Sequence, residues 1–363
     1  MRGTIIGGGS FIQDGEQKYV LTLVALDGTG VDGVAVAANK TPVRLIFTTF
    51  LPHAIAIDPN HAGRAAVFEK HGPGACYVDL LRGEVLAPIT TPSSRHFYGH
   101  GAYSVDGNRL YATESLLDDA FRGALVIRDA KTLQQLGTMP TFGTAPHDCI
   151  LLDDGTTMVV TNGGGPLRGG AAPNICYIDI PSETLLEEVK LKAPRFNAGH
   201  IAITPRGDLA MVSAPRTGLP NKSRSLGAVS LKPKGQPLVT MSKPKKVVQR
   251  MKGETLSVLI QQPQQRVLAT HPEGDMITMW SLSEGKLLRK YDDFSQPRGI
   301  CTTLDGQLWV VGHSLGTGVA LSFIDASSGA VLPHKRIYPS YISGSHIFAH
   351  QLPPSPAATA SPQ

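Results

Sequence analysis

Five histidines recur at nearly regular intervals along this 363-residue chain. They are His53, His100, His147, His200 and His346, and Arg298 occupies the corresponding position between the last two. The spacing is 47 residues from His53 to His100, 47 to His147 and 53 to His200. Neutral imidazole is the commonest nitrogen ligand of iron, copper, nickel and zinc. If the fold brings these side chains together, they would bind a metal ion or a metal complex.

The sequence that follows each histidine repeats one pattern, a strand, a tight turn and a second strand. Examples are PHAIAIDPNHAGRAAVFE from Pro52, GHGAYSVDGNRLYATES from Gly99 and PHDCILLDDGTTMVVTNG from Pro146. Turns such as V-D-G and D-D-G between apolar runs indicate β-hairpins. A third strand follows, for example ALVIRDAKTLQQLGTM. A repeat of about 49 residues with four short strands is typical of the blade of a β-propeller.

Six such repeats leave strands over at both ends of the chain. The C-terminal YISGSHIFAHQL and the N-terminal TIIGGGSFI, KYVLTLVALDG and VRLIFTTFL would complete one more blade. The sequence therefore predicts an all-β fold, a single seven-bladed β-propeller over residues 1–352 that is closed by pairing of its N- and C-terminal strands. Residues 353–363, with the sequence PPSPAATASPQ, are rich in proline, alanine and serine. They have no large apolar side chain to bury and are predicted to be disordered.

A propeller would gather the five histidines in a ring at one mouth of its channel, because each begins the innermost strand of a blade. The number of residues between histidine and turn is four in some repeats and five in others. A shift of one residue reverses the side-chain direction in a regular strand. The ring therefore requires that the histidines lie in the loop before the strand or that a β-bulge absorbs the difference. Arg298, His96 and Tyr98 are expected to bind a ligand beside the ring.

The width of such a channel limits how the ring would bind metal. Ligand bonds are about 2.0–2.1 Å long, so one ion would contact two or three neighbouring histidines. The whole ring could instead hold a metal cluster, a haem or an anionic ligand. Among the metals, iron or copper is the expected cofactor. Alternatively, the histidines only line the channel and hydrogen bond to water and backbone carbonyls.

Two other classes of function remain open. A lactonase-type hydrolase would need a carboxylate near the histidines for acid/base chemistry, and Asp148 is the nearest candidate. A protein-interaction scaffold would present an exposed surface, for which the lysine-rich residues 242–252 are the best candidate. The GHSLG motif around Ser314 lacks the following helix of a nucleophile elbow, and no C-x-x-C-H haem motif is present. A binding protein is therefore favoured over an enzyme.

Other polar residues and the cysteines are interpreted as structural. Glu114, Asn162, His271 and His313 follow the second strands of their repeats and are expected to be hydrogen bonded within the blades. The four cysteines lie far apart with no C-x-x-C pair, which excludes the usual zinc and thioredoxin-type motifs.

Charge and hydropathy restrict the partners. The net charge of +5 is modest, and the lysine-rich segment has no interleaved aromatic residues, so nucleic acid is not an expected partner. No apolar run approaches the roughly 18 residues needed to span a bilayer, so no membrane span is expected. The N-terminus lacks the pattern of a secretion signal, which predicts a cytoplasmic protein or one whose leader has been removed.

The segments RHFYGHGAYSVDGNRLYATES, GTAPHDCILLDDGTTMVVTNGG and GGGSFIQDGEQKYVLTLVALDGTG resemble the bacterial propeller family known as domain of unknown function 1513. The similarity covers nearly the whole chain apart from its tail. It implies an exported, periplasmic protein with iron-uptake or redox proteins as partners, and a part in acquiring iron or another metal. By this resemblance His53, His100, His147 and His200 match histidine positions of the family. The lysine-rich extension and the missing export signal depart from the family pattern.

Overall fold

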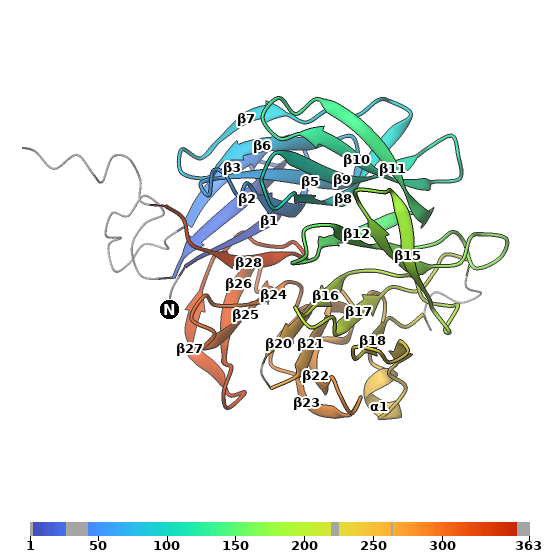
Figure 1. Ribbon diagram of the computed structural model, residues 1–363. Helices are drawn as coiled ribbons and strands as arrows, with labels where there is room; N and C mark the ends of the chain where they lie inside the picture. The colour runs from blue at the N-terminus through green and yellow to red at the C-terminus, as the bar shows by residue number, and fades with distance from the viewer. Residues whose placement is uncertain (1–2, 27–42, 219–224, 263, 354–363) are drawn as a thin grey trace, which may run out of the picture. The chain divides into compact units, whose positions relative to one another are not determined.

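The computed structural model describes residues 3–26, 43–218, 225–262 and 264–353, and nearly all of its regular structure is β-strand (Figure 1). The α-helix in these ranges is the short α1 (Lys245–Val248), and a 3-10 helix, η2 (Pro272–Gly274), follows it. No helix of the described part is long and apolar enough to cross a membrane. Of the tail predicted to be disordered, residues 354–363 lie outside the described residues.

The chain divides into two compact units, each built from segments that are not contiguous in sequence. Unit 1 contains residues 1–69, 74–90 and 298–363, and unit 2 contains residues 70–73 and 91–297.

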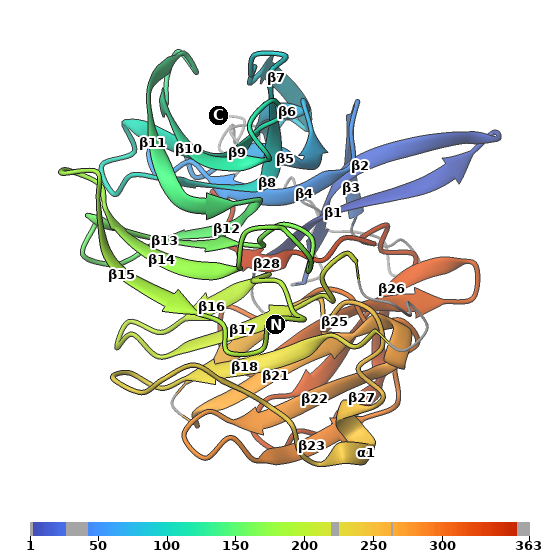
Figure 2. The ribbon, with the colours of Figure 1, turned by 90° about the vertical axis from the view of Figure 1, so that its right-hand side faces the viewer.

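Unit 1 contains a four-stranded sheet made from both ends of the chain. Its order is β28 (Ile347–His350), β1 (Thr4–Gln13), β2 (Glu16–Ala25) and β3 (Val43–Thr48). β1 and β2 form a long antiparallel hairpin, seen in Figure 2, and the first residues of β1 also pair with β28. A second sheet consists of β24 (Ile300–Thr302), β25 (Leu308–Leu315), β26 (Gly318–Asp325) and β27 (Val331–Ile337). Further strands are β4 (Pro52–Ile57), β5 (Arg64–Gly72), β6 (Ala75–Asp79) and β7 (Glu84–Pro88), and the last residues of β5, from Lys70 onward, belong to unit 2.

Unit 2 repeats the same four-stranded antiparallel meander along its sequence. Its strands begin with β8 (Arg95–Tyr103), β9 (Arg109–Leu116), β10 (Arg122–Asp129) and β11 (Gln135–Thr144). The next sheet contains β12 (Pro146–Leu151), β13 (Thr157–Asn162), β14 (Asn174–Asp179) and β15 (Thr184–Lys190). It is followed by β16 (Ile201–Ile203), β17 (Leu209–Ser213), β18 (Ala228–Lys232) and β19 (Val239–Thr240). The last sheet contains β20 (Val258–Gln261), β21 (Arg266–His271), β22 (Met276–Ser281) and β23 (Leu287–Tyr291).

The all-β propeller fold is confirmed, but the prediction of seven blades closed into a ring by the terminal strands is wrong. In the described residues five four-stranded sheets are separate blades, whereas β4 to β11 form one eight-stranded sheet. The cause is the length of β5. Its first residues pair with β4 and β6, and its last residues, Lys70 and Gly72, pair with Tyr98 and Phe97 of β8. β28 does pair with β1, but this pairing completes the terminal sheet of unit 1 and does not establish a ring of seven separate blades.

The turns that the sequence predicts between first and second strands are present. Gly107 and Gly155 adopt φ values of 69° and 70°, a conformation that glycine reaches without steric strain. Their N–H groups donate to the carbonyls of Ser104 and Leu152, both at 2.9 Å. The aspartate that precedes each glycine accepts a backbone N–H two residues further on, which closes the turn locally. The local D-G signal is therefore sufficient to place these hairpins.

The four cysteines are free and buried in the hydrophobic cores. In unit 1, Cys76 packs in the core that contains Val67 and Val78, and Cys301 packs in a second core. In unit 2, Cys149 and Cys176 share one core. Burial raises the pKa of Cys76 to about 12, so this thiol stays protonated at neutral pH. The cysteines thus act as small apolar core residues.

Candidate metal-binding site

Each of the five predicted histidines lies where regular strand pairing is interrupted or has not yet begun. The shift in pairing falls between Pro52 and Ala54 around His53, between Phe97 and Gly101 around His100, and between Pro146 and Cys149 around His147. His200 and His346 immediately precede β16 and β28. Both arrangements that the sequence required, a bulge and a loop position, therefore occur.

Buried threonines on the second strands hold these interruptions in place. Thr113 Oγ1 donates to the carbonyl of His100 at 3.1 Å. Thr161 Oγ1 donates to the carbonyl of Gly199 at 2.8 Å and accepts the backbone N–H of Asp148 at 2.9 Å. Both threonines are completely buried. Thr161 thus connects the bulge after His147 with the backbone that precedes His200.

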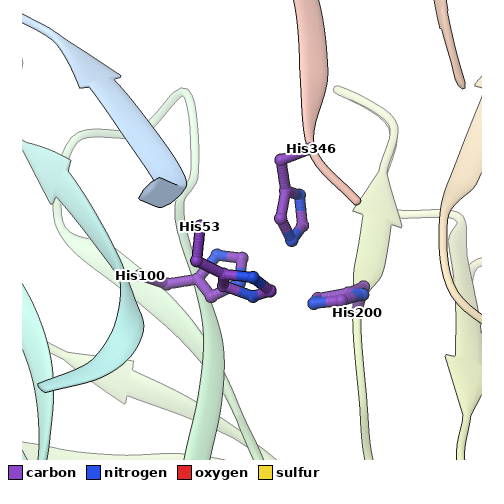
Figure 3. Close-up of side chains that lie close together, drawn as sticks. All are labelled: His53, His100, His200 and His346. Carbon is purple, nitrogen blue, oxygen red and sulfur yellow. The ribbon is translucent and has the colours of Figure 1, made fainter. Parts of the chain in front are cut away.

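In unit 2, His100 and His200 both have Nδ1 occupied by an acceptor. Nδ1 of His100 lies 2.9 Å from Oδ1 of Asp148, and Nδ1 of His200 lies 2.5 Å from the carbonyl oxygen of Leu256. Because an ionised carboxylate and a carbonyl only accept hydrogen bonds, each Nδ1 is the protonated nitrogen. In the neutral ring Nε2 then carries the lone pair. Each of the two histidines offers a ligand atom within 4.8 Å of the other, and both are labelled in Figure 3.

His147 is the third imidazole of this cluster in unit 2. Its Nε2 lies 2.8 Å from Nε2 of His200, and since the lone pair is on His200, His147 is the donor. The ring centroids of His147 and His200 are 4.4 Å apart, and that of His100 lies 5.3 Å from His200. All three side chains are buried. We call His100, His147, His200 and Asp148 the unit 2 histidine cluster.

Burial controls the charges of this cluster. It lowers the pKa of His200 to about 3, with smaller contributions from electrostatic interactions with His100 and Lys70. For Asp148, burial alone raises the pKa, but interactions with His100, His200 and the N–H of Ile201 outweigh it and hold the pKa below its ordinary value. At neutral pH the cluster therefore contains an ionised carboxylate beside a neutral His200 that has a lone pair available for a metal ion.

Unit 1 contains a second pair of predicted ligands, His53 and His346. Their ring centroids are 4.7 Å apart and the rings meet edge to face at 84°. Nδ1 of His53 lies 3.4 Å from Oγ of Ser345. Each histidine of this pair offers a ligand atom within 4.8 Å of the other, and Figure 3 labels both. His53 is 9% exposed, whereas His346 is half-buried.

The structure distributes the three expected ligand-binding residues differently. Arg298 lies in unit 1 just before β24, half-buried, and its N–H donates to the carbonyl of Gly312 at 2.8 Å. His96 and Tyr98 both lie on β8 in unit 2. The Tyr98 ring is 6.4 Å from that of His147, which places it beside the cluster. That these three residues bind a ligand stays a prediction.

The polar residues that we interpreted as structural are hydrogen bonded within the sheets. Their partners are Arg128 for Glu114, Thr141 and Asn174 for Asn162, Thr255 and Thr278 for His271, and Ser322 for His313. All four side chains are buried.

Sequence reasoning missed two groups that orient the imidazoles. Asp148 was considered only as an acid/base group for a hydrolase, although it follows His147 directly. The carbonyl of Leu256 was not considered, because a main-chain acceptor leaves no signal in residue type. The one available signal was position, since Leu256 stands where other repeats have histidine.

The fold and the cluster define a class, an all-β propeller protein with buried histidines that could hold a metal ion. Residues 51–331 match the model of the family described as protein of unknown function (DUF1513), and the chain belongs to this family. Its structure is similar to a chain described as hydrazine synthase of Kuenenia stuttgartiensis, with a TM-score of 0.63 over 86% of this chain and 92% of that chain. At 13% sequence identity this similarity shows the fold alone. No curated protein matches the chain.

Proposed function

We propose that this chain binds a first-row transition metal ion, iron or copper, through the Nε2 atoms of His100 and His200. The observation that carries the proposal is the occupied Nδ1 of each ring. Histidines that ligate metals almost always donate their other N–H to a carboxylate, carbonyl or water, which orients the ring and makes the ligand nitrogen more basic. Asp148 and Leu256 supply these two acceptors.

The donor set supports a transition metal ion over calcium or magnesium. Calcium and magnesium take oxygen ligands, whereas imidazole suits zinc, copper, iron and nickel. Thiolate ligands are not part of the proposal, because all four cysteines are packed in hydrophobic cores.

In the metal-free chain, His147 is a hydrogen-bond donor to His200 and not a metal ligand. Two nitrogens bound to one tetrahedral ion are about 3.3 Å apart when the bonds are about 2.0–2.1 Å long. The Nε2 atoms of His147 and His200 are only 2.8 Å apart, which is a hydrogen-bond distance. His147 therefore donates to His200 in the metal-free chain and must give up this bond before His200 can bind an ion. His147 is then the candidate third ligand.

His53 and His346 are the remaining candidate ligands, and metal stoichiometry decides their role. If they bind an ion of their own, each pair accounts for one of two ions.

The deciding experiment is elemental analysis of tag-free full-length chain purified without chelator and after loading with iron(II), copper(II) or zinc. The test variant is His100→Ala/His200→Ala, with His100→Gln/His200→Gln as a second variant in case the first does not fold. The control is His61→Ala/His334→Ala, which removes two exposed histidines. Near-stoichiometric iron or copper that only the test variants lose supports the proposal. Absence of metal in the loaded wild type, or equal loss in the control, overturns it.

We further propose a periplasmic location and a role as an accessory protein for metal uptake or redox proteins. The support is the family resemblance. Fractionation of cells that express the complete gene tests the location, and recovery in the cytoplasmic fraction contradicts it.

The contact between His100 and Asp148 also favours a second candidate function, hydrolysis of a lactone. A carboxylate that orients an imidazole is the arrangement of a general base. Lactone hydrolysis by the metal-free chain that is lost in His100→Gln would support this alternative, and inactivity towards short and long lactones would reject it.

A further inference from the structure

A cavity of about 710 Å³ lies within unit 2 next to the histidine cluster. His147 and Tyr98 line it, together with residues 163–166 of the glycine-rich loop between β13 and β14. Cavities of this size commonly hold small organic ligands. Binding of a metal ion does not account for it.

Arg216 gives this cavity a buried positive charge. Its side chain is 7% exposed and lines the cavity. The guanidinium donates four hydrogen bonds, all to backbone carbonyls, those of Gly165 and Pro194 at 2.9 Å, Pro166 at 3.0 Å and Ala171 at 2.8 Å. Among the described residues no carboxylate forms an ion pair with it. The carbonyls satisfy its N–H groups, but they do not neutralise its charge.

The other charged residues of the cavity wall leave this charge in excess. Lys70 forms an ion pair with Glu254, with Nζ and Oε1 3.6 Å apart. Both line the cavity, and Arg216 is the remaining residue of its lining with a formal charge. The wall therefore carries one excess positive charge, which favours an anion.

The glycine-rich loop does not provide a phosphate-binding nest. The N–H groups of Gly163, Gly164 and Gly165 already donate to the carbonyls of Ala145, Thr144 and Ala171. Such a nest needs these N–H groups directed at the ligand. Part of the cavity wall is apolar, including Phe121 and Pro215. The lining thus fits an anion with an apolar body better than it fits a phosphate.

We propose that this cavity binds a small organic carboxylate, which the positive charges of Arg216 and Lys70 attract and whose apolar body contacts Phe121 and Pro215. The proposal goes beyond metal binding and does not depend on it. Because His147 lines the cavity, a bound carboxylate would lie beside the histidine cluster.

The test is a binding titration of the full-length, chelator-treated chain. Calorimetry and ligand-observed NMR measure the binding. The probes are benzoate, its neutral analogue benzamide, the cation of benzylamine, and inorganic phosphate. Benzoate is expected to bind more tightly than the other three. Equal binding of benzamide, or preference for phosphate or for the cation, overturns the proposal.

Two variants change the charge of the cavity in opposite directions without touching its backbone. Lys70→Met removes the excess charge, and Glu254→Gln increases it. We expect the benzoate Kd to rise about twofold to fivefold in Lys70→Met and to fall by a similar factor in Glu254→Gln. Changes of this size are typical of the interaction between partly exposed charges. The control pair Arg82→Met and Glu84→Gln alters an ion pair of the same 3.6 Å separation in unit 1. A flat series, or equal shifts in the controls, also overturns the proposal.

The result is separable from metal binding. The variant His100→Gln/His200→Gln is expected to keep benzoate binding in the absence of metal. If benzoate binds only to metal-loaded wild type, the anion is a ligand of the ion and the charge-based cavity site is rejected, while the metal proposal stands.

Discussion

The carboxylate of Asp148 contacts the Nδ1 atom of His100 with one oxygen and the N–H of Ile201 with the other. The second contact limits rotation of the carboxylate, so its first oxygen remains directed at the imidazole. Ile201 follows His200 in the chain, and Asp148 follows His147. One side chain therefore connects the segments that carry all three histidines of the unit 2 cluster.

We predict that Asp148→Asn weakens metal binding by about 10-fold to 100-fold, which is the usual effect of losing a group that orients a metal ligand. The amide lacks the negative charge that supports the protonated Nδ1, and it can also present its NH₂ group to this nitrogen. Competition with a chromophoric chelator measures the affinity. Asp305→Asn, at a surface turn, is the control and should leave affinity unchanged. Equal affinity of Asp148→Asn and wild type would contradict the role of Asp148.

The five histidines could be found from the sequence because they recur at nearly regular intervals, and this spacing is visible without any related sequence. The orientation of their rings could not, because it depends on groups that become neighbours only in the fold. The carbonyl of Leu256 accepts a hydrogen bond from His200, which lies 56 residues away in the sequence. His100 and Asp148 are 48 residues apart. No local pattern records such pairs.

Among the elements, the bulges at the start of β4, β8 and β12 determine where His53, His100 and His147 point. A bulge changes the direction of successive side chains, so a histidine and its neighbour need not alternate between the faces of the sheet. Around His100 and His147 the bulges leave backbone groups that the ladder no longer pairs, and Thr113 and Thr161 of the second strands supply replacement partners.

We predict that Thr161→Val lowers the free energy of unfolding by about 1–3 kcal/mol, because the N–H of Asp148 and the carbonyl of Gly199 each lose a buried partner. Valine keeps the shape and the β-branching of threonine, so packing should change little. Urea unfolding followed by circular dichroism measures the effect. Thr317→Val, at an exposed turn, is the control and should change stability by much less. A loss in Thr161→Val no larger than in the control would show that the hydroxyl is dispensable.

Prediction of the elements succeeded where the signal is local and failed where pairing is distant. The turns at Gly107 and Gly155 depend on a glycine and a neighbouring aspartate, which the sequence displays directly. The pairing of β5 with β8 depends instead on how far β5 continues beyond Phe68. This continuation joins two expected blades into one sheet, and nothing in the repeat pattern indicates it.

For the molecule as a whole, buried neutral histidines make stability dependent on pH. His271 is completely buried between Thr255 and Thr278, and burial lowers its pKa to about 3, with a smaller effect of Arg250. In the unfolded chain a histidine has an ordinary pKa near 6.5. Between these values the unfolded state binds a proton that the folded state does not. The contribution of His271 is therefore fully present above pH 6.5 and is lost as the pH falls towards about 3.

We predict that His271→Gln makes the stability of the chain less sensitive to acid. One proton fewer is taken up on unfolding, so the slope of unfolding free energy against pH below 6.5 should decrease by up to about 1.4 kcal/mol per pH unit. Urea denaturation at several pH values measures the slope, whatever the stability of the variant at neutral pH. His334→Gln, an exposed histidine, should keep the wild-type slope. An unchanged slope in His271→Gln would show that this residue is not neutral in the folded chain.

The sheet that joins β28 to β1 has a consequence for the order in which the chain folds during synthesis. All residues of unit 2 leave the ribosome before residue 298, whereas unit 1 needs residues from both sides of that segment. The edge of β1 therefore waits for its partner through almost the whole of translation. An open strand edge of this kind is a template for strands of other chains, so slow completion of the C-terminal segment leaves the nascent protein open to aggregation.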